Sequence, residues 1–250
     1  MGWRVELLAQ GYPGASLHHG TLGWSSVLLA HGPEGRIVLV DTGAFGLRGV
    51  LRERLTARGL RPEDVTDVLF SHLHYDHCDN WTLFPRARLH VHREELAWAL
   101  GLPEEDLLVP LPLVRALAAS GRTVSFSAGD EPLPGIRAVA TPGHSPHHTA
   151  FWIAAVPQPV IFAADAAKNL AELASGEAAM TPDAAASRDS IRRLRALWDA
   201  SPEALFLPGH DLPLRRSADG RPERIGARAA GIRAILGEDP ADSRIFPLDG

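Results

Sequence analysis

Short apolar runs separated by polar turns recur along the chain. Runs of this kind, rich in β-branched residues and bounded by glycine, proline or aspartate, predict β-strands. A turn signal at residues 31–35 joins two of them into a hairpin, and a glycine-rich loop is predicted over Gln10–Gly23. The predicted strands are Val5–Leu8, Val27–Ala30, Ile37–Val40, Val68–Phe70, Arg88–Val91, Thr123–Phe126, Ile136–Ala140, Thr149–Ala154, Val160–Ala163 and Leu205–Leu207.

Apolar positions at helical spacing predict helices between the strands. One of them begins at Thr181-Pro182-Asp183, which offers a capping threonine, a proline at the first helical position and then an acid. Residues 102–119 are strongly apolar but interrupted by three prolines, which favours broken helical turns over a groove. That stretch could be a lid or acyl-binding wall, a dimer surface, or core. The predicted helices are Arg48–Arg58, Glu94–Leu100, 182–200 and Arg221–Leu236.

The elements fall into two similar halves, each with several strands followed by helices. The halves cover roughly residues 1–122 and 123–250, and no serine- or glycine-rich linker separates them. We therefore expect a single domain over residues 1–250 with an internal pseudo-repeat of architecture. No repeat of the sequence itself is evident.

The composition is that of an ordinary soluble protein, with 45% hydrophobic and 22% charged residues. A net charge of −5 argues against a nucleic-acid partner or an anionic membrane surface. No apolar run approaches the roughly 20 residues that span a bilayer, and no leader pattern opens the chain. The single cysteine, Cys78, excludes an intrachain disulfide. These features predict a cytoplasmic location.

A dense polar patch follows the predicted strand Val68–Phe70. Three histidines and two aspartates occur within eight positions there, namely His72, His74, Asp76, His77 and Asp79. A loop at the end of a buried strand can direct several side chains at one point, and histidine and aspartate are common metal ligands. The patch therefore predicts a metal site.

Four other predicted strands also end in a residue of this kind. Asp41 follows one strand, His144 lies in Thr-Pro-Gly-His, Asp165 follows another strand, and His210 lies in Pro-Gly-His. Imidazole nitrogen and carboxylate oxygen suit zinc, manganese or iron. Apart from Asp41 and Asp79, these residues and the patch offer seven ligands, which is too many for one tetrahedral ion. Two ions that share a bridging carboxylate would use them all.

The ordered set His72-x-His74-x-Asp76-His77, then His144, Asp165 and His210, resembles the metallo-β-lactamase-fold hydrolase superfamily. Asp41-Thr42-Gly43 looks like that family's first motif, so the resemblance runs from about residue 25 to 211. It implies an α/β (α+β) fold, a four-layer αββα sandwich of two mixed β-sheets flanked by helices. It also implies two divalent metal ions, with zinc preferred and manganese or iron as alternatives. By this resemblance one ion is held by His72, His74 and His144, the second by Asp76, His77 and His210, with Asp165 as the bridge and Asp41 orienting a ligand or the loop.

The resemblance implies a hydrolase in which a hydroxide between two metal ions attacks the carbonyl of a small ester, lactone or thioester. Asp76 and Asp165 would then be the catalytic residues. Candidate substrate contacts are Tyr75, His147 and Lys168, each of which also has an ordinary structural or solvated interpretation.

Several branches of the superfamily remain open. Lactonases active on acyl-homoserine lactones often carry a tyrosine between the bridging aspartate and the last histidine, and the interval Asp165–His210 has none. Glyoxalase II-like thioesterases usually show Gly-Gly-Asn where this chain has Cys78-Asp79-Asn80. A phosphodiesterase or nuclease is the main alternative, supported only by six arginines between positions 215 and 233. A non-catalytic metal-binding protein and a homodimer are further possibilities.

Overall fold

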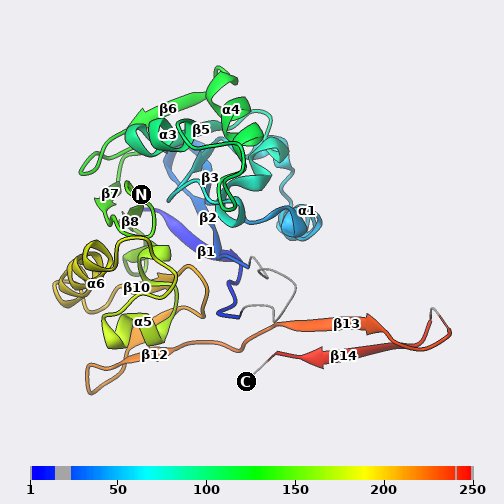
Figure 1. Cartoon of the computed structure of the whole chain (residues 1–250). Helices are drawn as coiled ribbons and strands as arrows, with labels where there is room; N and C mark the ends of the chain where they lie inside the picture. Colours follow the sequence, from blue (N-terminus) through cyan, green and yellow to red (C-terminus); the bar gives the residue numbers. More distant parts are fainter. Residues whose placement is uncertain (1, 15–23, 240, 249–250) are drawn as a thin grey trace.

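Two six-stranded sheets form the centre of the molecule (Figure 1). The computed structural model describes residues 2–14, 24–239 and 241–248, so most of the predicted loop Gln10–Gly23 lies outside the described residues. In the first sheet, β1 to β3 are antiparallel and β3 to β6 are parallel. Its strands lie in sequence order: β1 (Arg4–Ala9), β2 (Val27–His31), β3 (Ile37–Val40), β4 (Asp67–Leu69), β5 (Arg88–His92) and β6 (Thr123–Phe126).

The second sheet is built from the later part of the chain and is mainly antiparallel. Only β9 and β10 run parallel to each other in it. The boundary between the two sheets lies between Phe126 and Ile136. The strands of the second sheet also lie in sequence order: β7 (Ile136–Ala140), β8 (Thr149–Ile153), β9 (Val160–Ala164), β10 (Leu205–Pro208), β11 (Leu214–Arg216) and β12 (Pro222–Arg224).

Helices cover the outer face of each sheet, which gives four layers. Figure 1 shows α3 and α4 over the first sheet and α6 and α5 beside the second. The six helices are α1 (Arg48–Thr56), α2 (Tyr75–Cys78), α3 (Arg93–Leu100), α4 (Leu111–Ala119), α5 (Leu170–Ser175) and α6 (Ala184–Asp199) among the described residues. The αββα sandwich expected from the resemblance is confirmed.

Three buried apolar clusters join these layers. One lies between the first sheet and its helices, where Leu51 of α1 and Leu117 of α4 are fully buried. The second joins the two sheets face to face and includes Phe151 and Phe162. The third packs α6 onto the second sheet through residues such as Trp198. Burial of this apolar surface drives the layers together, at about 25 cal/mol per Å² removed from water.

Most predicted elements lie within one or two residues of the observed ones, but the predicted helix Arg221–Leu236 is wrong. The segment instead contains strand β12, a turn at Gly226 with φ of +89°, and strand β13 (Gly231–Ile235). Pro222 and the two glycines explain the error, because they interrupt helical hydrogen bonding and permit a turn. β13 pairs with β14 (Ser243–Pro247) in a hairpin that extends away from the sheets (Figure 1).

The apolar stretch 102–119 divides into two parts. Residues from 111 onward form α4, whose Leu111, Val114 and Leu117 are core residues, whereas Leu107 is 91% exposed. The expected broken turns therefore occur only before Leu111. Among the described residues, no helix is both long and apolar enough to cross a bilayer.

Candidate metal centre

All seven predicted ligands converge at one edge of the two facing sheets. His72 and His74 follow β4, and the short helix α2 carries the next two residues of the patch. The remaining three follow strands of the second sheet, His144 after β7, Asp165 after β9 and His210 after β10. The sheets thus act as two rigid supports whose strand ends present side chains toward each other.

Three imidazoles form what we call the first group, His72, His74 and His144. A ring nitrogen from each lies within 4.8 Å of the other two, and all three side chains are buried. His74 Nδ1 is 3.0 Å from His144 Nε2. Two ring nitrogens this close share one proton or face a common cation.

Asp76, His77 and His210 form what we call the second group. His210 Nε2 lies 3.3 Å and His77 Nε2 lies 3.5 Å from Asp76 Oδ2. Neighbouring ligands of a tetrahedral zinc ion are about 3.4 Å apart when each bond is about 2.1 Å long. The spacing in the second group is therefore that of a coordination sphere.

Asp165 lies between the two groups and presents one oxygen to each. Its Oδ1 atom is 3.2 Å from Nε2 of both His77 and His210. Its Oδ2 atom is 3.2 Å from His144 Nε2, in the first group. A carboxylate in this position can bridge two cations.

The polar atoms in this centre fit a divalent metal ion. His72 Nε2, His77 Nε2 and Asp165 Oδ1 are buried and lack a hydrogen-bond partner among the described residues. Buried polar atoms are normally satisfied, so three unsatisfied atoms in one place require an explanation. A metal ion coordinated by nitrogen and oxygen would satisfy them.

Asp41 supports the centre from below the patch. Its Oδ2 atom lies 2.8 Å from His77 Nδ1, which leaves the opposite ring nitrogen directed at Asp165. The same carboxylate accepts hydrogen bonds from the Ser71 N–H and hydroxyl, at 2.8 and 2.7 Å. Asp41 adopts a positive φ of 58°, a conformation that aspartate and asparagine tolerate better than most residues. The predicted orienting contact is therefore present.

The two groups differ in their electrostatics. Burial lowers the pKa of His74 to about 4 and that of His144 to about 3, so their imidazoles are neutral at pH 7. Burial also opposes the charging of His210, but the Asp165 and Asp76 carboxylates outweigh it and raise the pKa of His210 to about 10. In the metal-free protein, a protonated His210 therefore offsets negative charge on Asp165 and Asp76.

The backbone approaches Asp165 closely at Gly209. A β-carbon at this glycine would lie 2.1 Å from Asp165 Oδ1 and 2.8 Å from the Ala164 carbonyl carbon. Ala164 itself has a φ of +44°, which is a strained conformation for a residue with a β-carbon. The Pro-Gly-His motif therefore needs its glycine so that His210 can reach the Asp165 carboxylate.

The candidate substrate contacts occupy different environments. Tyr75 begins α2 between two of the converging residues, and its N–H donates to Leu108 O at 2.8 Å. The Lys168 ammonium donates to Ala179 O at 2.7 Å and lies 3.1 Å from the Glu172 carboxylate. These two contacts hold the Lys168 ammonium against its own segment. The structure therefore differs from the interpretation of Lys168 as a solvated lysine.

His147 belongs to a separate cluster behind the centre. Its ring stacks on His92 at 5.6 Å, and its Nδ1 atom is 3.5 Å from the Glu94 carboxylate. His92 Nε2 accepts a hydrogen bond from the Ala128 N–H, so a neutral His92 carries its proton on Nδ1. In this form neither ring nitrogen of His92 has a lone pair free to bind a cation.

Several further residues surround the centre. His148, which follows His144 closely in the sequence, is buried, and its Nε2 atom accepts from the Asp165 N–H at 3.2 Å. The Ser25 hydroxyl donates to the Asp76 carbonyl. Glu95 of α3 is completely buried and accepts three hydrogen bonds from the histidine loops. The only sequence signal for Glu95 is its position on the same helical face as the buried Ala99.

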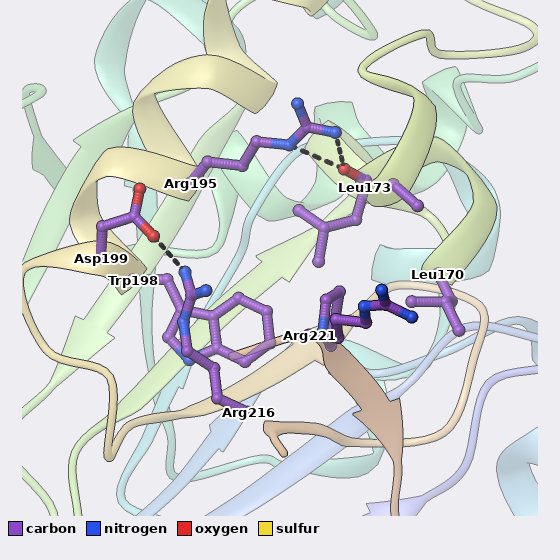
Figure 2. Close-up of a pocket in the computed structure, with 9 residues that line it drawn as sticks. Leu170, Leu173, Arg195, Trp198, Asp199, Arg216 and Arg221 are labelled. Carbon is purple, nitrogen blue, oxygen red and sulfur yellow. Dashed lines mark hydrogen bonds and ion pairs between the residues drawn. The ribbon is translucent and has the colours of Figure 1, made fainter. Parts of the chain in front are cut away.

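A cavity of about 570 Å³ is lined by residues of α5, α6, β11 and the start of β12, none of which belongs to the converging set (Figure 2). Its arginines are engaged with neighbouring groups. Arg195 donates to Leu173 O, and Arg216 pairs with Asp199 while lying 4.6 Å over the Trp198 ring. These contacts indicate that the arginines hold α5, α6 and β11 together.

Comparison with known proteins agrees with the geometry. Residues 20–210 match the family model described as the metallo-beta-lactamase superfamily. Metallo-beta-lactamase domain-containing protein 1 of Mus musculus is 32% identical over 71% of this chain and 60% of its own length. An N-acyl homoserine lactonase of Bacillus thuringiensis is 29% identical over 67% of this chain and 64% of its own length. The chain therefore spans less than two thirds of either relative.

A solved structure shows the same arrangement of the backbone. It is an N-acyl homoserine lactone hydrolase with the product N-hexanoyl-L-homoserine bound at the catalytic metal centre. The TM-score is 0.65 at 22% identity, and the match covers 84% of this chain and 93% of that one. At this identity the likeness concerns the fold.

Proposed function

Because the chain belongs to the metallo-β-lactamase superfamily, we propose that it is a hydrolase that uses two divalent metal ions against an ester, lactone or thioester carbonyl. The observation that carries this proposal is Asp165, whose two carboxylate oxygens face two separate groups of ligands. A bridge of this kind is needed only where two cations lie side by side. The all-nitrogen and oxygen donor set favours zinc, with manganese or iron as alternatives.

In this proposal, some residues bind the metal ions, and Asp76 also takes part in proton transfer. The first group would hold one ion and the second group the other. Bound ions would supply Lewis acidity toward the carbonyl oxygen and a water whose pKa is lowered to about 7. Asp76, whose side chain keeps 11% of its surface exposed, would orient that water and accept its proton. Asp41 would keep the His77 ring in the orientation that binding requires.

Protonation of the leaving group needs an acid near Asp76. No tyrosine occurs between Asp165 and His210, and Tyr12, one of two tyrosines in the chain, packs against Trp24 at 5.2 Å. Tyr75 adjoins Asp76 in α2 and is the phenol best placed along the chain for this role. We therefore assign Tyr75 as the candidate acid.

The segment before α4 supports an acyl substrate. Leu108 is bound to the Tyr75 backbone and is 39% exposed, and its neighbour Leu107 is 91% exposed. Two exposed leucines beside the centre can cover an alkyl chain. The net charge of −5 would disfavour a nucleic-acid substrate.

A substrate panel on metal-analysed protein tests the proposal. We expect about two metal equivalents, and a higher kcat/KM for esters, lactones or thioesters than for a bis-aryl phosphodiester. The reverse ranking would assign the chain to the phosphodiesterase branch. Two equivalents without turnover on any of these substrates would make it a non-catalytic metal-binding protein.

A further inference from the structure

Glu95 is a buried carboxylate that the proposed reaction does not use. Its side chain is inaccessible to solvent, and no lysine, arginine or histidine among the described residues pairs with it. Burial raises the pKa of the Glu95 carboxyl to about 7, and hydrogen bonds from Ser145, Leu73 and His147 oppose that rise. A buried carboxyl group is costly unless hydrogen bonds compensate for the lost water, so it needs a role that an apolar side chain could not fill.

The partners of Glu95 come from two loops of the metal centre. Glu95 Oε1 accepts from the N–H of Leu73, which lies between His72 and His74, at 3.3 Å. Glu95 Oε2 accepts from the hydroxyl of Ser145, the residue after His144, at 2.8 Å. It also accepts from the His147 N–H at 3.2 Å. The loop that contains Leu73 follows strand β4 of the first sheet. The loop that contains Ser145 and His147 follows strand β7 of the second.

We propose that Glu95 is a positioning residue that clamps the His72–His74 loop against the His144 loop. Among the described residues, the named strands of the two sheets do not pair with each other, and one isolated bridge joins Trp3 to Ala155. That bridge does not involve the histidine loops, so the loops need ties of their own. A hydrogen bond from the Thr149 N–H to Ser71 O, at 2.9 Å, is one such tie, and the three hydrogen bonds of Glu95 together form another. The clamp fixes the spacing of the three imidazoles of the first group. This inference rests on the metal centre of the proposed function.

Only a carboxylate satisfies all three donors. Each oxygen of Glu95 faces at least one backbone N–H, and a carboxylate presents acceptors on both sides. A glutamine would place its NH₂ group against either the Leu73 N–H or the His147 N–H, whichever way the amide is turned. An aspartate is shorter by one methylene and could not reach both loops.

The clamp acts on the first group and not on the second. The second group is held by Asp41 through His77, and by Asp211, which follows His210 and is bound by Arg224 and Arg228. None of these contacts involves Glu95. Loss of the clamp should therefore weaken one metal site selectively, whereas general destabilisation would weaken both.

Cobalt titration of the metal-free protein tests the clamp without any substrate. His210→Ala leaves the first group intact, and His144→Ala leaves the second. In the His210→Ala background, Glu95→Gln should weaken cobalt binding about 10- to 100-fold, as expected for a group that supports a ligand. In the His144→Ala background, the same change should alter it by less than about twofold. The intensity of the cobalt absorption should change only in the first background.

Two control variants separate the clamp from general stability. Glu53→Gln changes an exposed glutamate of α1, and Asp67→Asn removes another buried carboxylate, which pairs with Arg88 and His90. Asp67→Asn should lower Tm, and both controls should leave cobalt binding unchanged. If Glu95→Gln does not fold, Ser145→Ala removes a single donor and should weaken the first site several-fold.

Equal weakening of both sites by Glu95→Gln, or no weakening, would overturn the clamp. A wild-type protein that binds two cobalt ions without hydrolysing any ester, lactone, thioester or phosphodiester would refute the hydrolase alone. The clamp would then still be decided by the cobalt titrations, so the two failures are distinguishable.

Discussion

The two groups of the metal centre lie side by side but are built differently. The first contains only imidazoles, whose burial keeps them neutral, and its support is a carboxylate that does not face the centre. The second contains a carboxylate of its own, and its histidines pair with Asp76 and Asp165. The first group therefore depends on hydrogen bonds to a carboxylate outside the centre, whereas the second depends on carboxylates within it. Asp165 faces both.

The largest effect is expected at Asp165, because its change removes what the two groups share. Asp165→Asn should lower kcat/KM by at least about 10³-fold and abolish one of two metal equivalents, since an amide is a poor bridge between cations. Activity and metal content would be measured on the same preparation. Asp199→Asn, an exposed carboxylate on α6, serves as the control, and full activity in Asp165→Asn would contradict the dinuclear centre.

A β-carbon at Gly209 should disturb the bridge without altering any ligand. Gly209→Ala places this atom 2.1 Å from Asp165 Oδ1, so the loop must move. We expect a loss of about 1–3 kcal/mol in the free energy of unfolding and of about 10²-fold in kcat/KM. Gly49→Ala in α1 meets no neighbouring atom and should stabilise by up to about 1 kcal/mol. Similar behaviour of the two variants would show that Gly209 is not needed for close approach.

Asp41→Asn should affect the second group most, because Asp41 contacts His77 directly and reaches His72 only through the Ser71 hydroxyl, which lies 3.0 Å from His72 Nδ1. Asparagine tolerates the positive φ of 58°, so the variant tests the carboxylate contact to His77 and not the backbone. Metal binding should weaken about 10- to 100-fold at the second group, and by a smaller factor at the first. Metal titration of this variant beside Glu95→Gln would show opposite site preferences. Loss of both equivalents together would remove the distinction between the groups.

The smallest effect concerns the acyl chain. If Leu107 and Leu108 cover it, each added methylene should gain up to about 0.8 kcal/mol, or about fourfold in KM. The series would be measured on straight-chain esters or thioesters with the wild type and with Leu108→Ser. A flat series in the wild type would remove these leucines from the substrate site.

The sequence predicted the seven converging residues because each follows a strand, and strand ends at one edge of a sheet lie near one another. His72, Asp165 and His210 are examples in which a polar residue follows an apolar run. Glu95 could not be found in this way, since an acid in the first turn of a helix is ordinarily exposed. Its role depends on the distance between two loops of different sheets, which no local pattern encodes.

The C-terminal error has a similar physical origin. Apolar and basic residues between 221 and 236 suggested an amphipathic helix, but Pro222 and Gly226 break helical hydrogen bonding there. Pairing of β12 with β11 then brings Arg224 to Asp211, beside His210. This long-range contact outweighs the local preference for helix.

The central claim is that Asp165 joins two metal sites into one catalytic centre. The most direct measurement is a zinc titration of the metal-free protein in which binding and hydrolysis of a reactive ester, lactone or thioester are followed together. Two equivalents should bind, and activity should appear only as the second site fills. Full activity after one equivalent, with no second binding event, would contradict the claim.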